Sequence, residues 1–333
     1  MATMLIGTSQ GLYAKSLDAD RDSDCSVVFN NNRMFGDIRS PVVCDRENSK
    51  RFYLGTTRAG IWRTDDAGIS WTEINNGLVH KEVWWLAQQP ETGHLYAGTG
   101  PASLYKSTDQ GEQWEEFDNL LALEGRADWS LHLPPYFPRI RNIAFAHNDP
   151  SLIACAIEEG WLIRTSDGGN SWSCAKSGLH PDVHSVTIMP DDPHIVLAAT
   201  GDGLYRSTDS GNTFARCAGL DKPYVTHVLS NPKAPKMVFA VASDNRPRYW
   251  RMDEGAGTGF FLSSDSGKLW CEITAGIPPY VHAGSYAATW DPTDEHIIHV
   301  GLDDGSVWRV DLDGSASLWQ TGFPAVTAIS VTR

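Results

Sequence analysis

The chain has 333 residues, of which 41% are hydrophobic and 20% charged, so it carries enough apolar mass for a sizeable core. Its 41 acidic and 27 basic side chains give a formal net charge of −14, which argues against nucleic acid or an anionic membrane surface as a partner. No apolar run approaches the length of a transmembrane helix, so we expect no membrane partner.

The N-terminal segment and the cysteines bear on the compartment. The sequence MATMLIGTSQGLYAKS lacks the basic stretch followed by a long apolar region that is typical of a secretory signal peptide. The six cysteines are scattered without a C-x-x-C pair, which indicates reduced, mostly buried thiols rather than a disulfide framework or a zinc site. Together these features predict a cytoplasmic protein.

One eight-residue phrase recurs along the chain, each time with an aspartate, a glycine two residues later and a final aromatic residue. An aspartate in a tight turn accepts hydrogen bonds from the backbone N–H groups ahead of it, and glycine adopts a conformation unfavourable to other residues. A period of roughly forty to sixty residues is typical of a propeller or a solenoid. The copies are TDDAGISW (64–71), STDQGEQW (107–114), TSDGGNSW (165–172), STDSGNTF (207–214) and SSDSGKLW (263–270).

The strand pattern around each phrase predicts the architecture. Residues 180–219 read as four β-rich runs, DVHSVTIMP, IVLAAT, LYRS and FARC, separated by Gly, Pro and Asp. The C-terminal FPAVTAISV has the pattern of an innermost strand, and the N-terminal MLIGTSQGLYAK matches second and third strands. We therefore predict one all-β domain over 1–333, a seven-bladed β-propeller of four-stranded antiparallel blades in which the N- and C-terminal strands share one blade. The expected blades are 320–333 with 1–33, 34–77, 78–129, 130–179, 180–219, 220–276 and 277–319.

Two segments do not fit the repeat. Residues 119–138 precede the first strand of one blade, and residues 243–259 separate the second and third strands of another. Both are expected on the face opposite the repeated turns, and long loops on one face of a scaffold usually carry function. The alternative is that they only cover apolar surface.

Three histidines occupy the same position in alternate repeats. His80, His180 and His282 each precede the central apolar residue of a first strand by six positions, which places them near the mouth of an axial channel. Neutral imidazole is a common ligand of transition metals, so the three predict a site for a divalent Zn, Fe, Mn or Cu ion. His184 would lie one layer below as a catalytic residue. The alternatives are an inherited structural role and a metal-free catalytic or ligand-binding role.

A basic cluster indicates an anionic small-molecule ligand. Arginines bind carboxylate and phosphate through paired hydrogen bonds, and a ligand ring could stack on a nearby tryptophan. The alternative is that these cations form ion pairs with carboxylates of the protein. The predicted substrate-binding residues are Arg139, Arg141, Lys222, Arg248, Trp84 and Trp250.

The repeated phrase resembles the Asp-box, or BNR, repeat of sialidase-like β-propellers, and the resemblance covers nearly the whole chain. Sialidases use an arginine triad, a Tyr–Glu nucleophile pair, an acidic Asp and an N-terminal F/Y-R-I-P motif. Here MFGDIRSP (34–41) places Arg39 near the first arginine without the motif, and Tyr286 has no matching Glu on a neighbouring strand. Larger xyloglucan-cleaving relatives use paired aspartates in a cleft between two propellers, which a single propeller does not provide.

Three functions remain open. The favoured one is a small-molecule enzyme with an axial His/Arg-lined, metal-dependent pocket and an anionic substrate, with His184 and Tyr286 as catalytic residues and hydrolase, lyase or oxidoreductase chemistry. The second is a non-catalytic protein-interaction or assembly propeller, like those that assist photosystem II assembly. The third is a carbohydrate-binding or glycosidase-like propeller, which would have to recruit carboxylates such as Glu82, Asp182 or Asp128.

Overall fold

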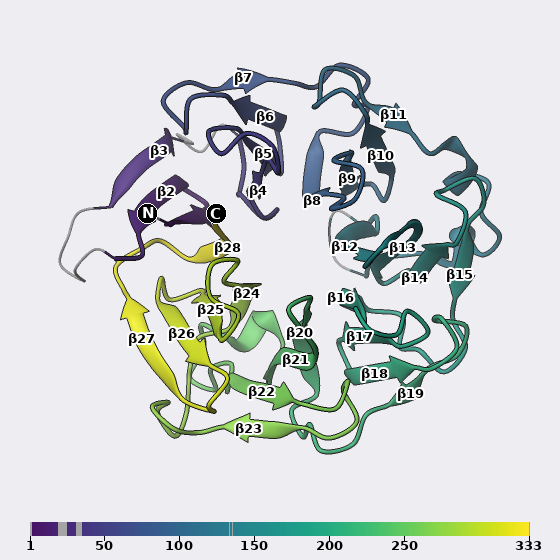
Figure 1. The fold of residues 1–333 in the computed structure, drawn as a ribbon. Coiled ribbons are helices and arrows are strands. Elements are labelled where there is room, and N and C mark those ends of the chain that lie inside the picture. Colours follow the sequence, from purple (N-terminus) through teal and green to yellow (C-terminus); the bar gives the residue numbers. More distant parts are fainter. Residues whose placement is uncertain (1, 19–24, 31–34, 133, 135, 333) are drawn as a thin grey trace. The chain divides into compact units, whose positions relative to one another are not determined.

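The computed structural model describes residues 2–18, 25–30, 35–132, 134 and 136–332. Within these residues the strands form seven four-stranded antiparallel sheets, so the chain is a seven-bladed β-propeller, as the sequence predicts (Figure 1). The helical elements of the described chain are three single 3-10 turns, η1 (Asp118–Leu120), η2 (Arg126–Asp128) and η3 (Pro247–Tyr249). None of its helices has the length and hydropathy needed to cross a bilayer.

The chain divides into two compact units. The first comprises Met1–Ala97, Tyr105–Glu115 and Ser285–Arg333 and holds most or all of four sheets. In spatial order their strands are β28 (Val326–Val331), β1 (Thr3–Thr8), β2 (Gly11–Ser16) and β3 (Ser26–Asn30); β4 (Val43–Cys44), β5 (Phe52–Thr56), β6 (Gly60–Thr64) and β7 (Thr72–Glu73); β8 (Glu82–Gln88), β9 (Leu95–Gly100), β10 (Leu104–Ser107) and β11 (Glu115–Glu116); and β24 (Ser285–Trp290), β25 (Ile297–Leu302), β26 (Val307–Asp311) and β27 (Ala316–Gln320).

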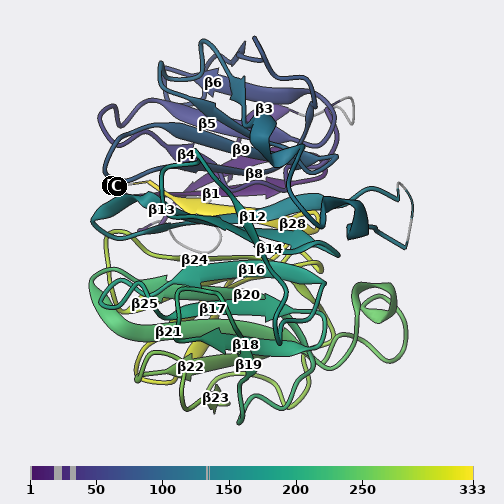
Figure 2. The same ribbon diagram turned by 90° about the vertical axis from the view of Figure 1, so that its right-hand side faces the viewer.

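The second unit comprises Gly98–Leu104 and Glu116–Gly284 and holds three sheets. Figures 1 and 2 let the reader follow β16, β17, β18 and β19 in order across one of them. The strands are β12 (Arg139–Ala146), β13 (Asp149–Glu158), β14 (Trp161–Thr165) and β15 (Ser173–Ala175); β16 (Val183–Ile188), β17 (Val196–Thr200), β18 (Gly203–Ser207) and β19 (Ala215–Arg216); and β20 (Tyr224–Asn231), β21 (Ala234–Ser243), β22 (Gly259–Ser263) and β23 (Cys271–Ile273).

The two ends of the chain form one sheet. β1 pairs antiparallel with β28, from Met4 opposite Val331 to Thr8 opposite Val326. All six residues of β28 are buried, as an innermost strand covered on both faces requires. The predicted sharing of a blade by the N- and C-terminal strands is therefore confirmed.

The repeated phrase is a turn held by its own side chains. In the copy at 207–214, the Asp209 carboxylate accepts hydrogen bonds from the backbone N–H of Thr213 at 2.9 Å and from the Ser207 hydroxyl at 2.7 Å. The Ser207 oxygen in turn accepts the backbone N–H of Gly211 at 2.9 Å, and Gly211 has a φ of +78°. A serine or threonine two residues before the aspartate is thus part of the turn, which the sequence alone did not assign. The equivalent aspartates are Asp66, Asp109, Asp167 and Asp265.

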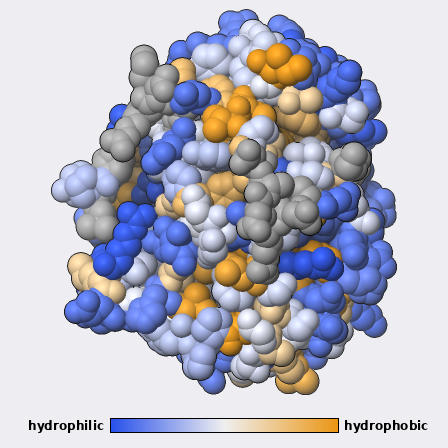
Figure 3. All heavy atoms as spheres, turned by 90° about the vertical axis from the view of Figure 1, so that its left-hand side faces the viewer, coloured by the Kyte–Doolittle hydropathy of each residue, from blue (hydrophilic) through white to orange (hydrophobic). Residues whose placement is uncertain are grey.

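The six cysteines are free thiols. Contrary to the expectation from the sequence, most of them are not buried. Cys155 is buried on a second strand, whereas Cys174 and Cys271 lie on the outer fourth strands β15 and β23, where less of the chain covers them. Figure 3 shows hydrophilic and hydrophobic side chains side by side on one face, so hydropathy does not single out a site there.

Candidate functional site

A pocket of about 360 Å³ opens in the second unit where both long segments of the sequence meet. Residues 128–132 belong to the segment before β12, and Arg246 belongs to the segment between β21 and β22. The turn between β13 and β14 and the residues before β16 supply the rest of the wall. We call this the carboxylate pocket; it is lined by Asp128, Ser130, His132, Glu159, Trp161, His180, Pro181, Asp182 and Arg246.

The turn between β13 and β14 has a strained backbone. Glu159 and Trp161, on either side of Gly160, have φ values of +55° and +61°, a region that side-chain-bearing residues rarely adopt. The Trp161 N–H donates to the carbonyl of Pro181 at 2.9 Å, and the Ser130 N–H donates to the carbonyl of Glu159 at 3.3 Å. Such conformations cost about 1–3 kcal/mol each and are concentrated at functional sites, because the surrounding structure must impose them.

Asp182 carries a stabilised negative charge in this pocket. Its carboxylate lies 3.2 Å from Nε2 of His184, and Nδ1 of His184 lies 2.7 Å from the carbonyl oxygen of Val225. Burial lowers the pKa of His184, but the charge of Asp182 outweighs this effect, so the pKa of His184 is raised. Burial likewise disfavours the Asp182 carboxylate, but His184 and Arg141 outweigh that effect and lower the pKa of Asp182 to about 2.

Glu159 is shifted in the opposite direction. Burial raises the pKa of Glu159, and the negative charge of Asp182 adds to the increase, while His132 at 3.5 Å opposes it. One pocket therefore contains a carboxyl group that holds its proton to higher pH and a carboxylate that stays ionised. Opposite environments of this kind assign an acid and a base in many enzymes.

The arginines that were expected to bind an anion are paired within the protein. Nε of Arg139 and Nη1 of Arg141 lie 2.5 and 2.9 Å from the two carboxylate oxygens of Glu158. The pairing follows from the sheet, since Arg139 on β12 lies opposite Glu158 on β13. Lys222 forms a similar pair with Asp244 at 2.9 Å. The ion-pair alternative thus describes these three cations.

His180 and Arg246 complete the polar wall of the pocket. The backbone N–H of Asp182 donates to Nδ1 of His180 at 3.2 Å, so in the neutral ring the proton is assigned to Nε2. Burial lowers the pKa of His180. The positive charges of His184 and Arg246 lower it further, whereas the nearby aspartates raise it. His180 therefore offers a neutral N–H donor near pH 7.

Two of the predicted substrate-binding residues, Trp250 and Arg248, lie in the long segment between β21 and β22. The predicted metal ligand His282 contacts the same segment. Trp250 is 3% exposed, and its indole N–H donates to the carbonyl of Asn245 at 2.7 Å, so its ring holds the segment in place. The guanidinium of Arg248 lies 4.4 Å from the ring of Tyr249. The His282 carbonyl accepts the N–H of Ala256 at 2.6 Å, which anchors the same segment.

The remaining predicted residues lie in the first unit. The guanidinium carbon of Arg39 is 4.6 Å from the ring centre of Tyr286 and 5.6 Å from that of Trp84. The Trp84 indole donates to Glu82 at 2.8 Å, and the His80 N–H donates to the Tyr105 hydroxyl at 3.4 Å. Trp84 and Tyr286 therefore share a cation–π cluster around an arginine.

The described residues contain no group of three or more His, Cys, Asp and Glu side chains arranged to hold a metal ion. The site predicted from His80, His180 and His282 thus remains a prediction from the sequence.

Comparisons with known proteins identify the fold. No family model and no curated protein sequence matches the chain, so the Asp-box assignment is not confirmed in that way. An ancestral GH74 enzyme has a TM-score of 0.62 at 19% identity over 80% of this chain and 35% of its own, and the Niastella koreensis GH74 enzyme has 0.64 at 15% over 84% and 45%. YCF48 bound to D1 peptide has a TM-score of 0.59 at 13% identity over 96% of this chain and 88% of its own.

At these identities the likeness shows a shared propeller fold. The chain spans less than half the length of either GH74 enzyme, whereas it matches most of the YCF48 chain.

Proposed function

We propose that the chain is a glycosidase-like enzyme that cleaves a glycosidic bond in the carboxylate pocket. The observation that carries the proposal is the presence in one pocket of Glu159, whose pKa is raised, and Asp182, whose pKa is lowered to about 2. Glycoside hydrolysis generally needs such a pair, one carboxyl group as the acid and one ionised carboxylate as its partner. The turn at Glu159 supports the proposal, because its backbone hydrogen bonds to Ser130 and Pro181 fix Glu159 at the wall of the pocket.

Each side chain has a defined part in this mechanism. Glu159 donates its proton to the glycosidic oxygen as the bond to the leaving sugar breaks. Asp182, held ionised by His184, stabilises the positive charge that develops at the anomeric carbon and attacks there to form a glycosyl–Asp182 ester. A water molecule deprotonated by Glu159 then displaces Asp182 from the anomeric carbon, which releases the sugar and restores both groups. His180 donates its Nε2 proton to a sugar hydroxyl, and the ring of Trp161 packs against an apolar sugar face.

We keep the anionic ligand expected from the sequence, but with Arg246 as its only proposed arginine partner. Arg246 lines the pocket and forms no ion pair with a described residue, unlike Arg139 and Arg141. An acidic group on the substrate would therefore pair with Arg246.

The similarity to GH74 enzymes is consistent with this proposal at the level of fold, but their activity is not transferred. Because the chain covers only 35% and 45% of those enzymes, the proposed site is built from the residues of its own pocket.

The test is hydrolysis of a panel of aryl glycosides and polysaccharides by the wild type and by Glu159→Gln and Asp182→Asn. We expect turnover of at least one substrate and a loss of about 100-fold or more in each variant. Asp221→Asn, at an exposed position outside the pocket, is the matched control and should retain full activity. A wild type inactive on the whole panel, or variants as active as the control, would show the proposal to be wrong.

A second candidate is a peptide-binding propeller. It is favoured by the structure of YCF48 bound to D1 peptide, whose chain is matched over 88% of its length. Recovery of a stoichiometric protein partner by the wild type, by Glu159→Gln and by Asp182→Asn alike, together with no glycoside turnover, would favour this function over hydrolysis.

A further inference from the structure

We propose that a second pocket, in the first unit, binds a neutral oligosaccharide. This hydroxyl pocket has a volume of about 830 Å³, within the range of roughly 300–1,000 Å³ typical of ligand sites. It lies where the first strands of four sheets end, at Cys44 of β4, Gln88 of β8, Trp290 of β24 and Val331 of β28. The inference concerns binding alone and does not depend on cleavage in the carboxylate pocket.

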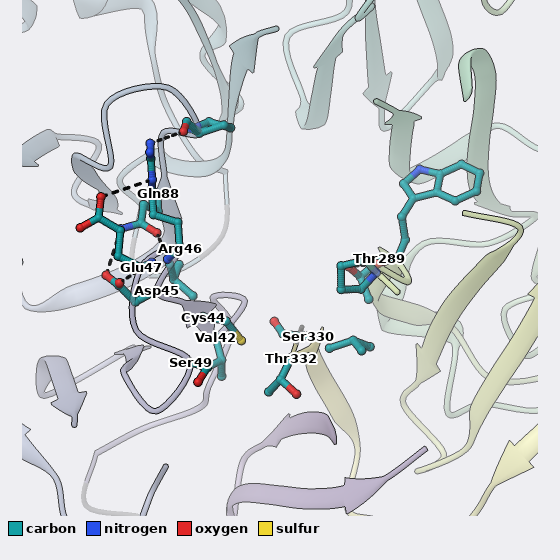
Figure 4. A pocket seen from close by; sticks show the side chains of 15 residues that line it. Val42, Cys44, Asp45, Arg46, Glu47, Ser49, Gln88, Thr289, Ser330 and Thr332 are labelled. Carbon is teal, nitrogen blue, oxygen red and sulfur yellow. Dashed lines mark hydrogen bonds and ion pairs between the residues drawn. The ribbon is translucent and has the colours of Figure 1, made fainter. Parts of the chain in front are cut away.

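The pocket is lined from several sides by polar groups. Figure 4 shows Arg46 and Gln88 along one wall, Thr289 on the opposite side, and Cys44, Ser330 and Thr332 between them. Because the side chains come from four strands and the loops that follow them, their positions are fixed by the sheets.

The charged groups of the lining are already compensated. The Asp45 carboxylate accepts the N–H groups of Glu47 and Asn48, each at 2.9 Å, and the amide of Gln88 at 3.2 Å. Burial opposes ionisation of Asp45, but these hydrogen bonds outweigh it and lower the pKa of this carboxyl group. Arg46 lies 3.7 Å from Glu47 and also donates to the carbonyl of Pro90. The frame therefore favours an uncharged ligand over an anion or a cation.

An unpartnered hydroxyl lines the pocket. The side chain of Ser330 lies on β28, and its hydroxyl forms no hydrogen bond with a described residue. It is therefore available to donate to, or accept from, a group inside the pocket. Thr332 accepts the Thr3 N–H at 2.9 Å and keeps its own O–H for donation to a ligand.

Part of the remaining lining is apolar. Trp290, Pro292 and Val42 contribute hydrophobic surface to the same pocket. A sugar ring presents C–H groups on its faces and hydroxyl groups at its edge, so it can contact the tryptophan and the serine and threonine hydroxyls at once. This mixture of surfaces favours a saccharide over a purely apolar ligand.

The experiment is calorimetric titration of the full chain with cellotetraose, maltotetraose, xylotetraose and mannotetraose. We expect at least one of the four to bind, and Ser330→Val and Trp290→Leu each to weaken binding about tenfold or more. Glu159→Gln should bind like the wild type, because that residue belongs to the carboxylate pocket. Near-ultraviolet circular dichroism confirms that each variant is folded.

A second readout does not rely on variants. Cys44 lines the hydroxyl pocket, so a saturating bound tetrasaccharide should slow its alkylation by iodoacetamide, as followed by peptide mass spectrometry. The proposal is overturned if none of the four sugars binds, if binding leaves Cys44 unprotected, or if binding is lost only in Glu159→Gln. The last result would place the sugar in the carboxylate pocket and would leave the proposed hydrolysis standing.

Discussion

The imidazole of His184 lies 3.2 Å from the carboxylate of Asp182, two residues earlier in the chain. The side chain of His184 is almost fully buried, whereas that of Asp182 keeps 18% exposure and lines the carboxylate pocket. The buried imidazole thus acts on the pocket through the aspartate. In the proposed mechanism Asp182 is the group that would contact the substrate, and His184 would position it.

Replacing His184 by Gln removes this ionisable partner of Asp182. We expect the pKa of Asp182 to rise from about 2 towards its usual value, and the free energy of unfolding at pH 7 to fall by about 3–5 kcal/mol, as when one partner of a buried pair is lost. In the wild type, the Asp182 contribution is present above its unfolded pKa and is lost as pH falls from about 4 to about 2.

The His184 contribution has the opposite sign: it is full below the unfolded pKa and is lost as pH rises through the raised folded pKa. Urea unfolding of both proteins between pH 2 and 9 measures these effects. A variant with the same pH dependence as the wild type would contradict the ion pair.

Glu159→Gly separates backbone strain from chemistry. Because glycine adopts a φ of +55° without a steric penalty, we expect unfolding free energy to rise by up to about 1 kcal/mol while glycoside turnover is lost. Ala67→Gly, at a φ of +60° in a repeated turn, is the control and should stabilise the protein without changing turnover. Chemical denaturation and the glycoside panel measure the two quantities. A glycine variant that keeps full activity would remove Glu159 from the mechanism.

Arg246→Ala tests the electrostatics at the rim of the pocket. The pKa of His180 is lowered by burial first and by nearby positive charges including Arg246, so removing the arginine should raise this pKa. NMR titration of the His180 ring protons measures the change. Arg248→Ala should leave the titration unmoved, since that guanidinium lies against Tyr249. Equal titration curves for the wild type and Arg246→Ala would mean that Arg246 does not face His180.

Gly284→Ala tests the support of the long segment between β21 and β22. A Cβ at this position would lie 2.0 Å from the ring of Trp250, so the ring and its segment must move. Limited proteolysis at residues 244–258 should therefore become faster. In the double variant with Trp250→Leu, the added methyl group should have little further effect, because the smaller side chain leaves it room. A Gly284→Ala protein as resistant as the wild type would refute the contact.

The fold could be predicted because each repeat carries its own turn and strand patterns in consecutive residues. The phrase at 207–214 marks a turn by residue type alone, and the apolar pattern of the chain ends identifies them as strands of one blade. Asp182 could be named only as one of several carboxylates that a glycosidase might use, since its ionisation depends on His184 and Arg141 from different strands.

Other parts of the site gave no signal in the sequence. Glycine is the residue usually found at positive φ. The residue types of Glu159 and Trp161 therefore do not indicate that both adopt such a conformation. The positions of Arg139 and Arg141 at a strand start were predicted, but their neutralisation by Glu158 depends on the register of β12 and β13. The burial of Trp250 depends on how an irregular segment folds back onto residues 282–284, which no periodic pattern encodes.

The most direct test of the account is a carbon-13 NMR titration of the side-chain carboxyl groups of Glu159 and Asp182 in the wild-type protein. We expect Asp182 to titrate near a pKa of about 2 and the pKa of Glu159 to lie above its ordinary value of 4.5. If both groups titrated near their ordinary values of 3.8 and 4.5, the pocket would hold no acid–base pair and the proposed hydrolysis would lose its basis.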